Sequence, residues 1–209
     1  RQFFCSRESF IVTCWLVLCL SCWLNPRRFS CFTPSPPLCA KLKPRDPSLM
    51  SFFEETLPKW AAVAESDAFA SGQQVPCKLF LDATVQLIKI FDSIYGMGMV
   101  KDDIDGNRAK IEANLLKLPA DAQPTATLQS MCRAELGAAK GAAAASVEGS
   151  TCLAILWLKR ALLLVEGMLE ALVADAKAEL ADCVNKGYEK GLKMHHNMIM
   201  KGVFNTVRL

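Results

Sequence analysis

Three polar residues with complementary hydrogen-bonding chemistry are spaced at helical intervals within KDDIDGNRAK, residues 101–110. If this segment forms a helix, Asp103, Asn107 and Lys110 stand at positions i, i+4 and i+7 and share one face. They supply a carboxylate acceptor, an amide that both donates and accepts, and a cation. Such a face could hold a ligand rich in hydroxyl groups. The pattern alone is more typical of an ordinary solvated helix face, so the rest of the chain must decide.

A second candidate pair lies within TCLAILWLKRALLLVEGMLEALVADA, the most hydrophobic segment after Met50. Trp157 and Arg160 are three residues apart and would share a helix face. A cation inside so apolar a helix needs a partner or an opening to solvent. An indole ring beside a guanidinium suits a sugar, whose C–H faces stack on the ring while its hydroxyls need directional partners. An aromatic residue at such a position is more commonly a core residue, and that interpretation stays open.

The two histidines of the chain, His195 and His196, are adjacent. On a helix they would point about 100° apart, so they could not easily share one ligand. No cysteine or carboxylate lies at metal-ligand spacing from them apart from the distant Glu189. The sequence also lacks a glycine-rich phosphate loop, a G-x-S-x-G elbow and a paired-carboxylate signature. We therefore predict no metal site, no cofactor and no catalytic residue, which counts against an enzyme.

The elements that must position these residues are predicted to be helices. From Met50 onward apolar residues recur at helical spacing, and no alternating strand pattern of useful length follows. An all-α fold is therefore expected. The segment that carries Trp157 is apolar around nearly its whole circumference, so it should be central and buried. The helix that carries Asp103 is expected to begin near Asp102 or Asp103. The expected helices are 52–70, 77–95, 102–118, 128–145 and 151–176, with one or two more within 179–209.

Composition and charge narrow the class of protein. The 209 residues are enough for one domain with a substantial core. A net charge of +3 without a concentrated basic stripe excludes a typical nucleic-acid-binding protein but allows weak attraction to an anionic membrane surface. Four cysteines after Met50 are scattered among apolar residues and are predicted to be buried free thiols, which indicates a reducing compartment; they are Cys77, Cys132, Cys152 and Cys183.

The first 49 residues differ in character from the rest. The apolar run from Phe10 to Leu24 is short for a membrane-spanning helix, which needs about 20 residues, and a Pro-rich basic stretch without periodicity follows it. Three interpretations compete: a secretory or anchor segment, an organelle-targeting extension, and residues outside the mature protein. Because the chain begins with Arg1 and its first methionine is Met50, we favour the third. Residues 1–49 are thus expected to be non-globular, and 50–209 to form the folded domain.

The motifs occur in the order FDSIYG, KDDIDGNRAKI, LAILWLKRALLLV and KMHHNMIMKGVF. This combination resembles the glycolipid transfer protein family, from about Phe52 to the end of the chain. The specific signature is D-x-x-x-N-x-x-K, followed by W-L-K-R and then by a histidine in a late helix. The resemblance implies a two-layer all-α fold. Relatives continue for two more helices that cover part of the acyl-chain pocket, so it also implies a domain that lacks them at its C-terminus.

The resemblance assigns roles to individual residues. Asp103, Asn107 and Lys110 match the residues that hydrogen-bond the first sugar and the amide region of the lipid. Trp157 matches the residue on which that sugar stacks. His196, the second of the histidine pair, matches the residue that contacts the ceramide amide. These five residues are therefore the expected headgroup-binding site.

Further positions refine the expected ligand. Arg160 matches the arginine of the W-L-K-R segment, where a supporting role is implied, and Phe91 and Phe204 match residues that line the lipid pocket. A branch of the same fold transfers ceramide-1-phosphate and has Lys and Arg at the positions of Asn107 and Trp157, because a phosphate needs cations. The residues present here favour an uncharged sugar. One departure is Met198, where the family has a tryptophan.

The resemblance implies non-enzymatic transfer of a glycolipid, in particular a glycosphingolipid, between membranes. It further implies transient contact with a membrane surface, a monomer, a cytoplasmic location and no nucleic-acid partner. Alternatives remain open: transfer or sensing of ceramide-1-phosphate or another sphingolipid, a helical interaction domain that binds no lipid, and a protein anchored by the apolar run of residues 10–24.

Overall fold

The structure is a computed structural model that describes residues 47–94, 96–138, 147–175 and 177–206. Within these residues every regular element is a helix, and pairing of extended backbone is confined to a single bridge between Pro76 and Thr127. The predicted all-α fold is confirmed. The elements are α2 (Pro47–Ala64), α3 (Asp67–Gly72), α4 (Cys77–Ile88), η1 (Lys89–Ser93), α5 (Gly98–Leu115), η2 (Gln123–Thr125), α6 (Leu128–Ala138), α7 (Thr151–Ala174), α8 (Leu180–Gly191) and α9 (Met198–Thr206).

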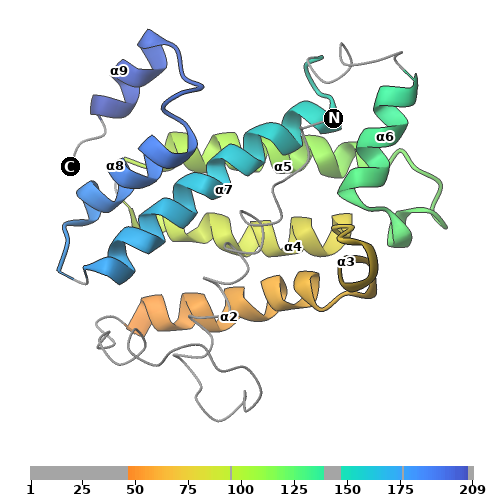
Figure 1. Cartoon of the computed structure of the whole chain (residues 1–209), viewed down its shortest axis with the longest axis horizontal. Coiled ribbons are helices and arrows are strands. Elements are labelled where there is room, and N and C mark those ends of the chain that lie inside the picture. Colours follow the sequence, from red (N-terminus) through yellow and green to blue (C-terminus); the bar gives the residue numbers. More distant parts are fainter. Residues whose placement is uncertain (1–46, 95, 139–146, 176, 207–209) are drawn as a thin grey trace.

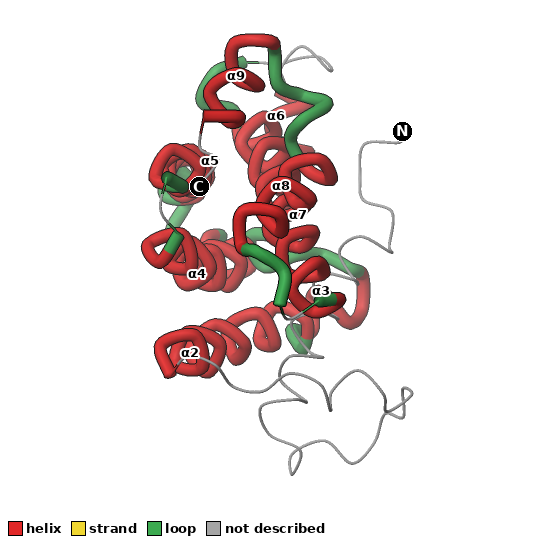
Figure 2. Tube along the Cα trace, turned by 90° about the vertical axis from the view of Figure 1, so that its left-hand side faces the viewer, coloured by secondary structure: helices red, strands yellow, loops and turns green. Residues whose placement is uncertain are grey.

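The helices are arranged in two layers. Helices α2, α4 and α5 lie side by side in one layer, and α7 and α8 form the other (Figures 1 and 2). Within the first layer Trp60 of α2 packs edge-on against Phe80 of α4, with ring centroids 5.8 Å apart. Helix α5 contacts α7 across the layers, while α6 and α9 lie toward opposite ends of the second layer (Figure 1). The helices that carry the candidate residues, α5 and α7, thus face each other.

Helix α7 is the centre of the fold, as its hydrophobicity predicts. It contacts α5, α6 and α8, and its side chains Leu158, Leu164 and Met168 are fully buried. Burying side chains of this size contributes about 1.5–3 kcal/mol each. The helix starts at a well-defined cap, where the Ser150 hydroxyl accepts a hydrogen bond from the backbone N–H of Leu153 at 3.1 Å. The position of Trp157 and Arg160 is therefore fixed by a rigid, buried element.

A carboxylate from α6 caps the N-terminus of α7. Glu135 accepts hydrogen bonds from the backbone N–H groups of Thr151, at 2.6 Å, and Cys152, at 3.0 Å. The first N–H groups of a helix have no partner within the helix and carry the positive end of its dipole, so a carboxylate there is stabilising. Although burial opposes it, the sum of these hydrogen bonds lowers the pKa of Glu135.

Helices α7 and α8 approach each other closely because α8 has glycines where they meet. A Cβ atom at Gly187 would lie 2.2 Å from the carbonyl oxygen of Leu164, and one at Gly191 would lie 2.4 Å from that of Arg160. Real Cβ contacts are longer than 3.0 Å, so only glycine fits at either position. This seam sets the end of α8, and hence the start of the turn that carries His196, beside the segment of α7 that carries Arg160.

Several predicted helix boundaries were wrong. The expected helix 52–70 is two helices, because Ser66 begins α3 by accepting a hydrogen bond from the N–H of Phe69. The expected helix 77–95 ends at Ile88 and tightens into the 3-10 segment η1. Helix α5 begins at Gly98 and not near Asp102 or Asp103, because the turn at Gly96 (φ +78°) returns the chain to helix directly after the buried Met97.

The C-terminal half follows its predictions more closely. Helix α7 ends at Ala174, and within the described residues 179–206 the chain forms two separate helices, α8 and α9. The expected helix 128–145 is α6 as far as Ala138, and the residues after it lie outside the described part of the chain. Cys77, Cys132 and Cys183 are buried free thiols as predicted, whereas Cys152 is only partly buried. Burial raises the pKa of Cys77 to about 12.

The apolar run of residues 10–24, for which three interpretations compete, lies outside the described residues. Across the described ranges, none of the helices combines the length and the apolar character that a membrane crossing demands.

Candidate functional site

Helix α5 places the residues of the D-x-x-x-N-x-x-K pattern at the edge of the interface between the layers. Ile104 and Ile111 are buried and fix the inner face of the helix. Asn107 lies on the same inner face and is only 5% exposed, whereas Lys110 is half-buried and Asp103 is exposed. The predicted i, i+4, i+7 register is therefore present, with the amide inside and the two charged groups at its rim.

The side chains of this trio influence one another. The Asn107 amide nitrogen donates to the backbone carbonyl of Asp103 at 2.8 Å, which orients the amide within its own helix. The pKa of Asp103 is raised because partial removal from water disfavours its charge. Lys110, His196 and the Asn107 hydrogen bond each act in the opposite direction. The carboxylate thus lies near a cation from its own helix and near a histidine from another element.

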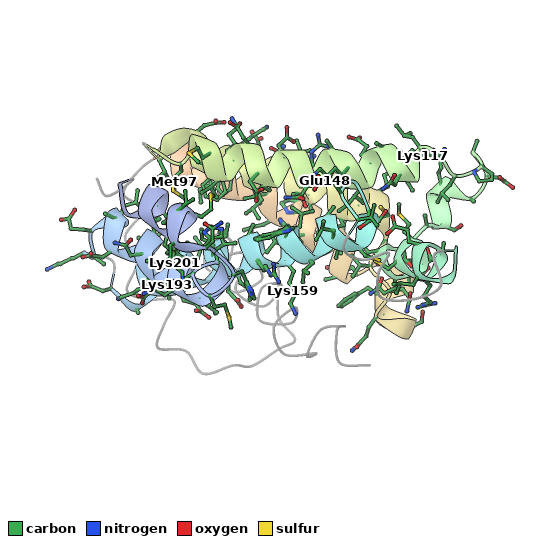
Figure 3. All side chains as sticks on the ribbon, turned by 90° about the horizontal axis from the view of Figure 1, so that it is seen from above. Met97, Lys117, Glu148, Lys159, Lys193 and Lys201 are labelled. Atoms are coloured by element: carbon green, nitrogen blue, oxygen red, sulfur yellow. The ribbon has the colours of Figure 1, made fainter. Side chains whose placement is uncertain are left out.

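Lys110 is paired with a residue that sequence reasoning missed. Its amino group lies 2.5 Å from a carboxylate oxygen of Glu148, which lies in the turn directly before α7. Figure 3 shows Glu148 beside α5. Hydrogen bonding and charge attraction from Lys110 lower the pKa of Glu148. An isolated glutamate in a loop gives no sequence signal of such a contact, because only the packing of α7 against α5 brings the two together.

The Trp157 and Arg160 side chains meet on α7 as their spacing predicts. The guanidinium carbon of Arg160 lies 4.6 Å from the centroid of the Trp157 ring, within the range of a cation–π contact. Trp157 is half-buried and packs against the hydrophobic core. Burial lowers the pKa of Arg160, as expected for a cation partly removed from water. Trp157 is thus neither a buried core residue nor a fully solvated one.

The adjacent histidines have different surroundings. His195 is exposed, whereas His196 is half-buried in the turn between α8 and α9. The His196 ring centroid lies 6.3 Å from that of Trp157. Burial lowers the pKa of His196; the charge of Asp103 acts against this, and the charges of Lys201 and Arg160 add to it. The structure therefore brings His196, and not His195, to the residues from α5 and α7.

His196 also contacts Tyr188 of α8, a second residue that sequence reasoning missed. The Tyr188 hydroxyl lies 3.2 Å from Nδ1 of His196, and the two ring centroids are 5.5 Å apart. Their spacing in the sequence does not reveal this contact, because α8 ends and a turn intervenes between them. It arises where the turn folds back over the last part of the helix.

The two predicted pocket phenylalanines lie in the apolar interior. Phe91 is in η1 and is 2% exposed, and Phe204 is in α9 and is 8% exposed. Phe204 stacks on Tyr188 with ring centroids 3.8 Å apart and planes 8° from parallel. Helix α9 is therefore tied to α8 directly beside His196. That these two rings line an acyl-chain pocket stays a prediction.

Six predicted residues thus form one cluster from three parts of the chain, which we term the polar cluster. It consists of Asp103, Asn107 and Lys110 of α5, Trp157 and Arg160 of α7, and His196 of the turn after α8. It offers a carboxylate acceptor, amide and imidazole hydrogen-bonding groups, two cations and a flat aromatic surface. Among the described residues, His, Cys, Asp and Glu nowhere gather in a group that could hold a metal ion. The cluster thus brings hydrogen-bond donors, hydrogen-bond acceptors and an aromatic face together at one place on the described part of the chain.

Comparison with known sequences identifies relatives of the chain. The family model described as Glycolipid transfer protein (GLTP) matches residues 75–208. The glycolipid transfer protein of Danio rerio is 35% identical over 145 residues, which cover 65% of this chain and 66% of that protein. The human pleckstrin homology domain-containing family A member 8 is 28% identical over 132 residues, which cover 62% of this chain. The chain spans only 24% of that relative's length.

Two solved structures are similar to the chain as well. HET-C2, a fungal glycolipid transfer protein, superposes with a TM-score of 0.55 and 27% identity over 66% of each chain. A structure of FAPP2, which is described as selecting simple glycosphingolipids with the GLTP fold, superposes with a TM-score of 0.56 and 28% identity. The superposition covers 65% of this chain and 62% of that one. Because the family model matches more than half of its residues and these structures share its fold, the chain belongs to the glycolipid transfer protein family.

Proposed function

We propose that this chain binds a glycolipid, in particular a glycosphingolipid, and carries it between membranes without covalent chemistry. The observation that carries the proposal is the polar cluster, in which residues from α5, α7 and the turn after α8 converge. The family supports it, as do relatives whose names refer to glycolipid transfer and to selection of simple glycosphingolipids. In this proposal the protein is not an enzyme and uses no cofactor or metal.

The sugar would be bound by the rim of the polar cluster. Trp157 provides a flat apolar surface for the C–H face of the first sugar, while Asp103, Asn107 and Lys110 exchange hydrogen bonds with its hydroxyls. His196 would meet the amide region of the lipid. An amide moved from water without partners costs roughly 1–3 kcal/mol, so directed hydrogen bonds at this point both permit binding and select the ligand.

The charges around the cluster favour a neutral headgroup. Its two cations, Lys110 and Arg160, are accompanied by the carboxylates of Asp103 and Glu148, and Lys110 is already paired with Glu148 at 2.5 Å. A phosphate would have to compete with that carboxylate and would gain no additional cation from Asn107 or Trp157. Ceramide-1-phosphate is therefore the second candidate ligand, supported only by the two cations.

The acyl chains would occupy the apolar interior between the two layers. Each CH₂ group kept out of water is worth about 0.8 kcal/mol, so a lipid leaves a bilayer slowly unless an equally dry environment replaces the hydrocarbon. Phe91 and Phe204 are buried in that interior. We propose that both contact the hydrocarbon of the ligand when it is bound.

Exposed apolar side chains lie in the turn and the helix on either side of His196, and they would make the transient contact with a membrane. They are Met194, Met198, Ile199 and Met200, with exposed fractions of 77%, 85%, 76% and 38%. Lys193 follows α8 and Lys201 lies in α9; both are labelled in Figure 3, and we propose that they interact with lipid headgroups. Apolar side chains flanked by cations are typical of peripheral membrane contact. A cytoplasmic, monomeric protein that touches membranes only during exchange is consistent with this surface.

The proposal is tested by transfer of a fluorescent glycosphingolipid between vesicles. Asp103→Val removes the acceptor at the rim and Trp157→Ala removes the stacking surface, so each should abolish transfer. Asp102→Val is the matched control, because Asp102 is the exposed neighbouring carboxylate on the same helix and lies outside the cluster. The control should transfer at the wild-type rate. Unchanged transfer by both cluster variants would contradict the proposal, and faster transfer of ceramide-1-phosphate than of the glycolipid would favour the second candidate.

A further inference from the structure

Tyr188 lies beneath the polar cluster and has no role in the function proposed above. Its side chain is 5% exposed, and its ring stacks on Phe204 at a centroid distance of 3.8 Å. Two parallel, closely packed rings hold the phenol in one orientation. The hydroxyl at the end of this fixed ring lies 3.2 Å from Nδ1 of His196. A buried group whose ring is held by stacking is therefore hydrogen-bonded to a residue of the turn between α8 and α9.

The direction of this hydrogen bond follows from the needs of the two groups. A buried hydroxyl hydrogen requires an acceptor, and within the described residues the His196 ring is the hydrogen-bond partner that Tyr188 has. If Nδ1 carried the hydrogen, it would donate to the phenol oxygen and leave the hydroxyl hydrogen without an acceptor. If Nδ1 is unprotonated, the hydroxyl donates to it and both groups are satisfied. The second arrangement leaves the hydrogen of the neutral imidazole on Nε2.

We infer that Tyr188 is a positioning residue: its hydroxyl donates to Nδ1 of His196 and so fixes the imidazole ring. The hydrogen on Nε2 of His196 is then the donor that meets an oxygen of the bound lipid. This inference rests on the proposed function, because it assigns His196 a ligand. The hydrogen bond from Tyr188 explains how a neutral His196 can act as a hydrogen-bond donor to the lipid. The ring is held from below by Tyr188 and faces Trp157 at a centroid distance of 6.3 Å. Asp103 supplies an acceptor near it, so the pair can read a ligand group that has both a donor and an acceptor.

The charged groups around His196 come from each neighbouring element. Asp103 of α5 favours protonation of the ring, while Arg160 of α7 and Lys201 of α9 disfavour it, as does burial. The ring is therefore expected to be neutral near pH 7.5, where one nitrogen donates and the other accepts. Under these conditions the choice of tautomer, and not the charge, decides what His196 offers to a ligand.

Tyr188→Phe is the variant that isolates the hydroxyl, because the ring and its stack on Phe204 are retained. The tautomer of His196 is read from ¹H–¹⁵N correlations of the imidazole nitrogens at pH 7.5, in the lipid-free protein. The chain contains only two histidines, so His195→Gln leaves a single imidazole in the spectrum. Wild-type protein should show Nε2–H alone, and Tyr188→Phe should show a mixture of both tautomers. A wild-type ring with hydrogen on Nδ1 overturns the inference, whatever the fate of the variant.

A double-mutant cycle tests whether Tyr188 acts through His196. Binding of a neutral glycosphingolipid is measured for Tyr188→Phe, for His196→Ala and for the combination. Loss of one neutral hydrogen bond should weaken binding about two- to tenfold in the wild-type background. In the His196→Ala background the same change should have almost no effect, because the group it positions is gone. Equal losses in both backgrounds would show that Tyr188 only packs, and would overturn the inference.

The two experiments separate this inference from the proposed function. If wild-type protein binds no glycolipid, the proposed function fails and so does the role of Nε2–H as a ligand donor. If wild-type protein binds the lipid but the cycle shows equal losses, only the positioning role fails. Phe204→Leu is the control for packing: it disturbs the stack but keeps the hydroxyl, and it should retain the single Nε2–H tautomer.

Discussion

The glycine seam between α7 and α8 makes a quantitative prediction. Gly187→Ala adds one methyl group where α8 crosses α7 most closely. The added Cβ would lie 2.2 Å from the carbonyl oxygen of Leu164 and 2.9 Å from the backbone nitrogen of Met168. These neighbours are backbone atoms of the central helix, which cannot rotate away as a side chain can. Helix α8 must therefore move away from α7.

The size of the effect follows from these distances. The closest contact is roughly 1 Å short of the 3.4 Å at which ordinary contact begins, so the helices must separate by about that amount. Overpacking of this kind typically costs about 1–3 kcal/mol, and the better helix propensity of alanine returns at most ~1 kcal/mol. Because the 2.2 Å contact is severe, we expect a net loss of about 1–2 kcal/mol, which for a chain of this length corresponds to a fall in Tm of about 2–8 °C. The turn after α8 should shift with the helix, so His196 should lose its place beside Trp157.

Thermal unfolding followed by circular dichroism measures the stability, and vesicle transfer measures the function. Gly106→Ala is the matched control, since it lies on α5 between cluster residues and its added Cβ would meet no atom within 4 Å. It should leave Tm unchanged or raise it, because glycine is a poor helix former. Gly187→Ala should lower both Tm and transfer. A Gly187→Ala protein as stable and as active as wild type would contradict the prediction, because it would show that α8 accommodates a Cβ atom beside α7 without cost.

Three further predictions follow from individual contacts. Glu135→Ala removes both hydrogen bonds at the N-terminus of α7 and should lower the free energy of unfolding by about 1–2 kcal/mol in urea titrations. Glu179→Ala is the control and should leave the free energy of unfolding unchanged, because the Glu179 side chain does not cap α8. Burial holds the folded-state pKa of both histidines below 6.5, so unfolding takes up protons and the free energy of unfolding should decrease as the pH drops below 6.5. The double variant His195→Gln, His196→Gln should remove this decrease, and its persistence would contradict the lowered pKa values of the histidines. Glu148→Gln frees Lys110 from its carboxylate and should raise binding of a sulfated glycolipid relative to a neutral one, and an unchanged ratio would show that this ion pair has no part in selectivity.

Periodicity was sufficient to predict the elements that carry the site. The nearly uniform hydrophobicity of residues 151–176 predicted a central buried helix, and α7 is that helix. The spacing of Asp103, Asn107 and Lys110 predicted one helix face, and all three lie at the edge of α5 that adjoins the second layer. Such patterns succeed because burial of one face decides the structure of a long helix more strongly than any local signal.

Local signals at helix ends were less reliable. Asp102 and Asp103 are good N-terminal residues, yet α5 begins four residues earlier than Asp102, at Gly98. The buried Met97 fixes the preceding turn, and this tertiary contact outweighs the capping preference of aspartate. The break at Ser66 was missed for the converse reason, because apolar residues stand at helical spacing on both sides of it while the serine side chain caps a new helix.

Contacts between elements far apart in the sequence were beyond prediction. Nothing in the sequence pairs Glu148 with Lys110 or Tyr188 with His196, because each contact depends on how loops and helices pack. The glycines of α8 look like helix-weakening residues in the sequence, and only the structure shows that they admit the backbone of α7. The resemblance to a known family identified His196 over His195, a choice that the spacing of two adjacent histidines left open.

Native mass spectrometry of the chain after incubation with vesicles shows directly whether the protein binds a neutral glycosphingolipid. The vesicles contain phosphatidylcholine with equal small amounts of a neutral glycosphingolipid and ceramide-1-phosphate, so the protein selects among three headgroups in one experiment. We expect one molecule of the neutral glycosphingolipid per chain, and loss of that complex in Trp157→Ala. A wild-type chain that carries no lipid, or carries ceramide-1-phosphate in preference to the glycolipid, would contradict it.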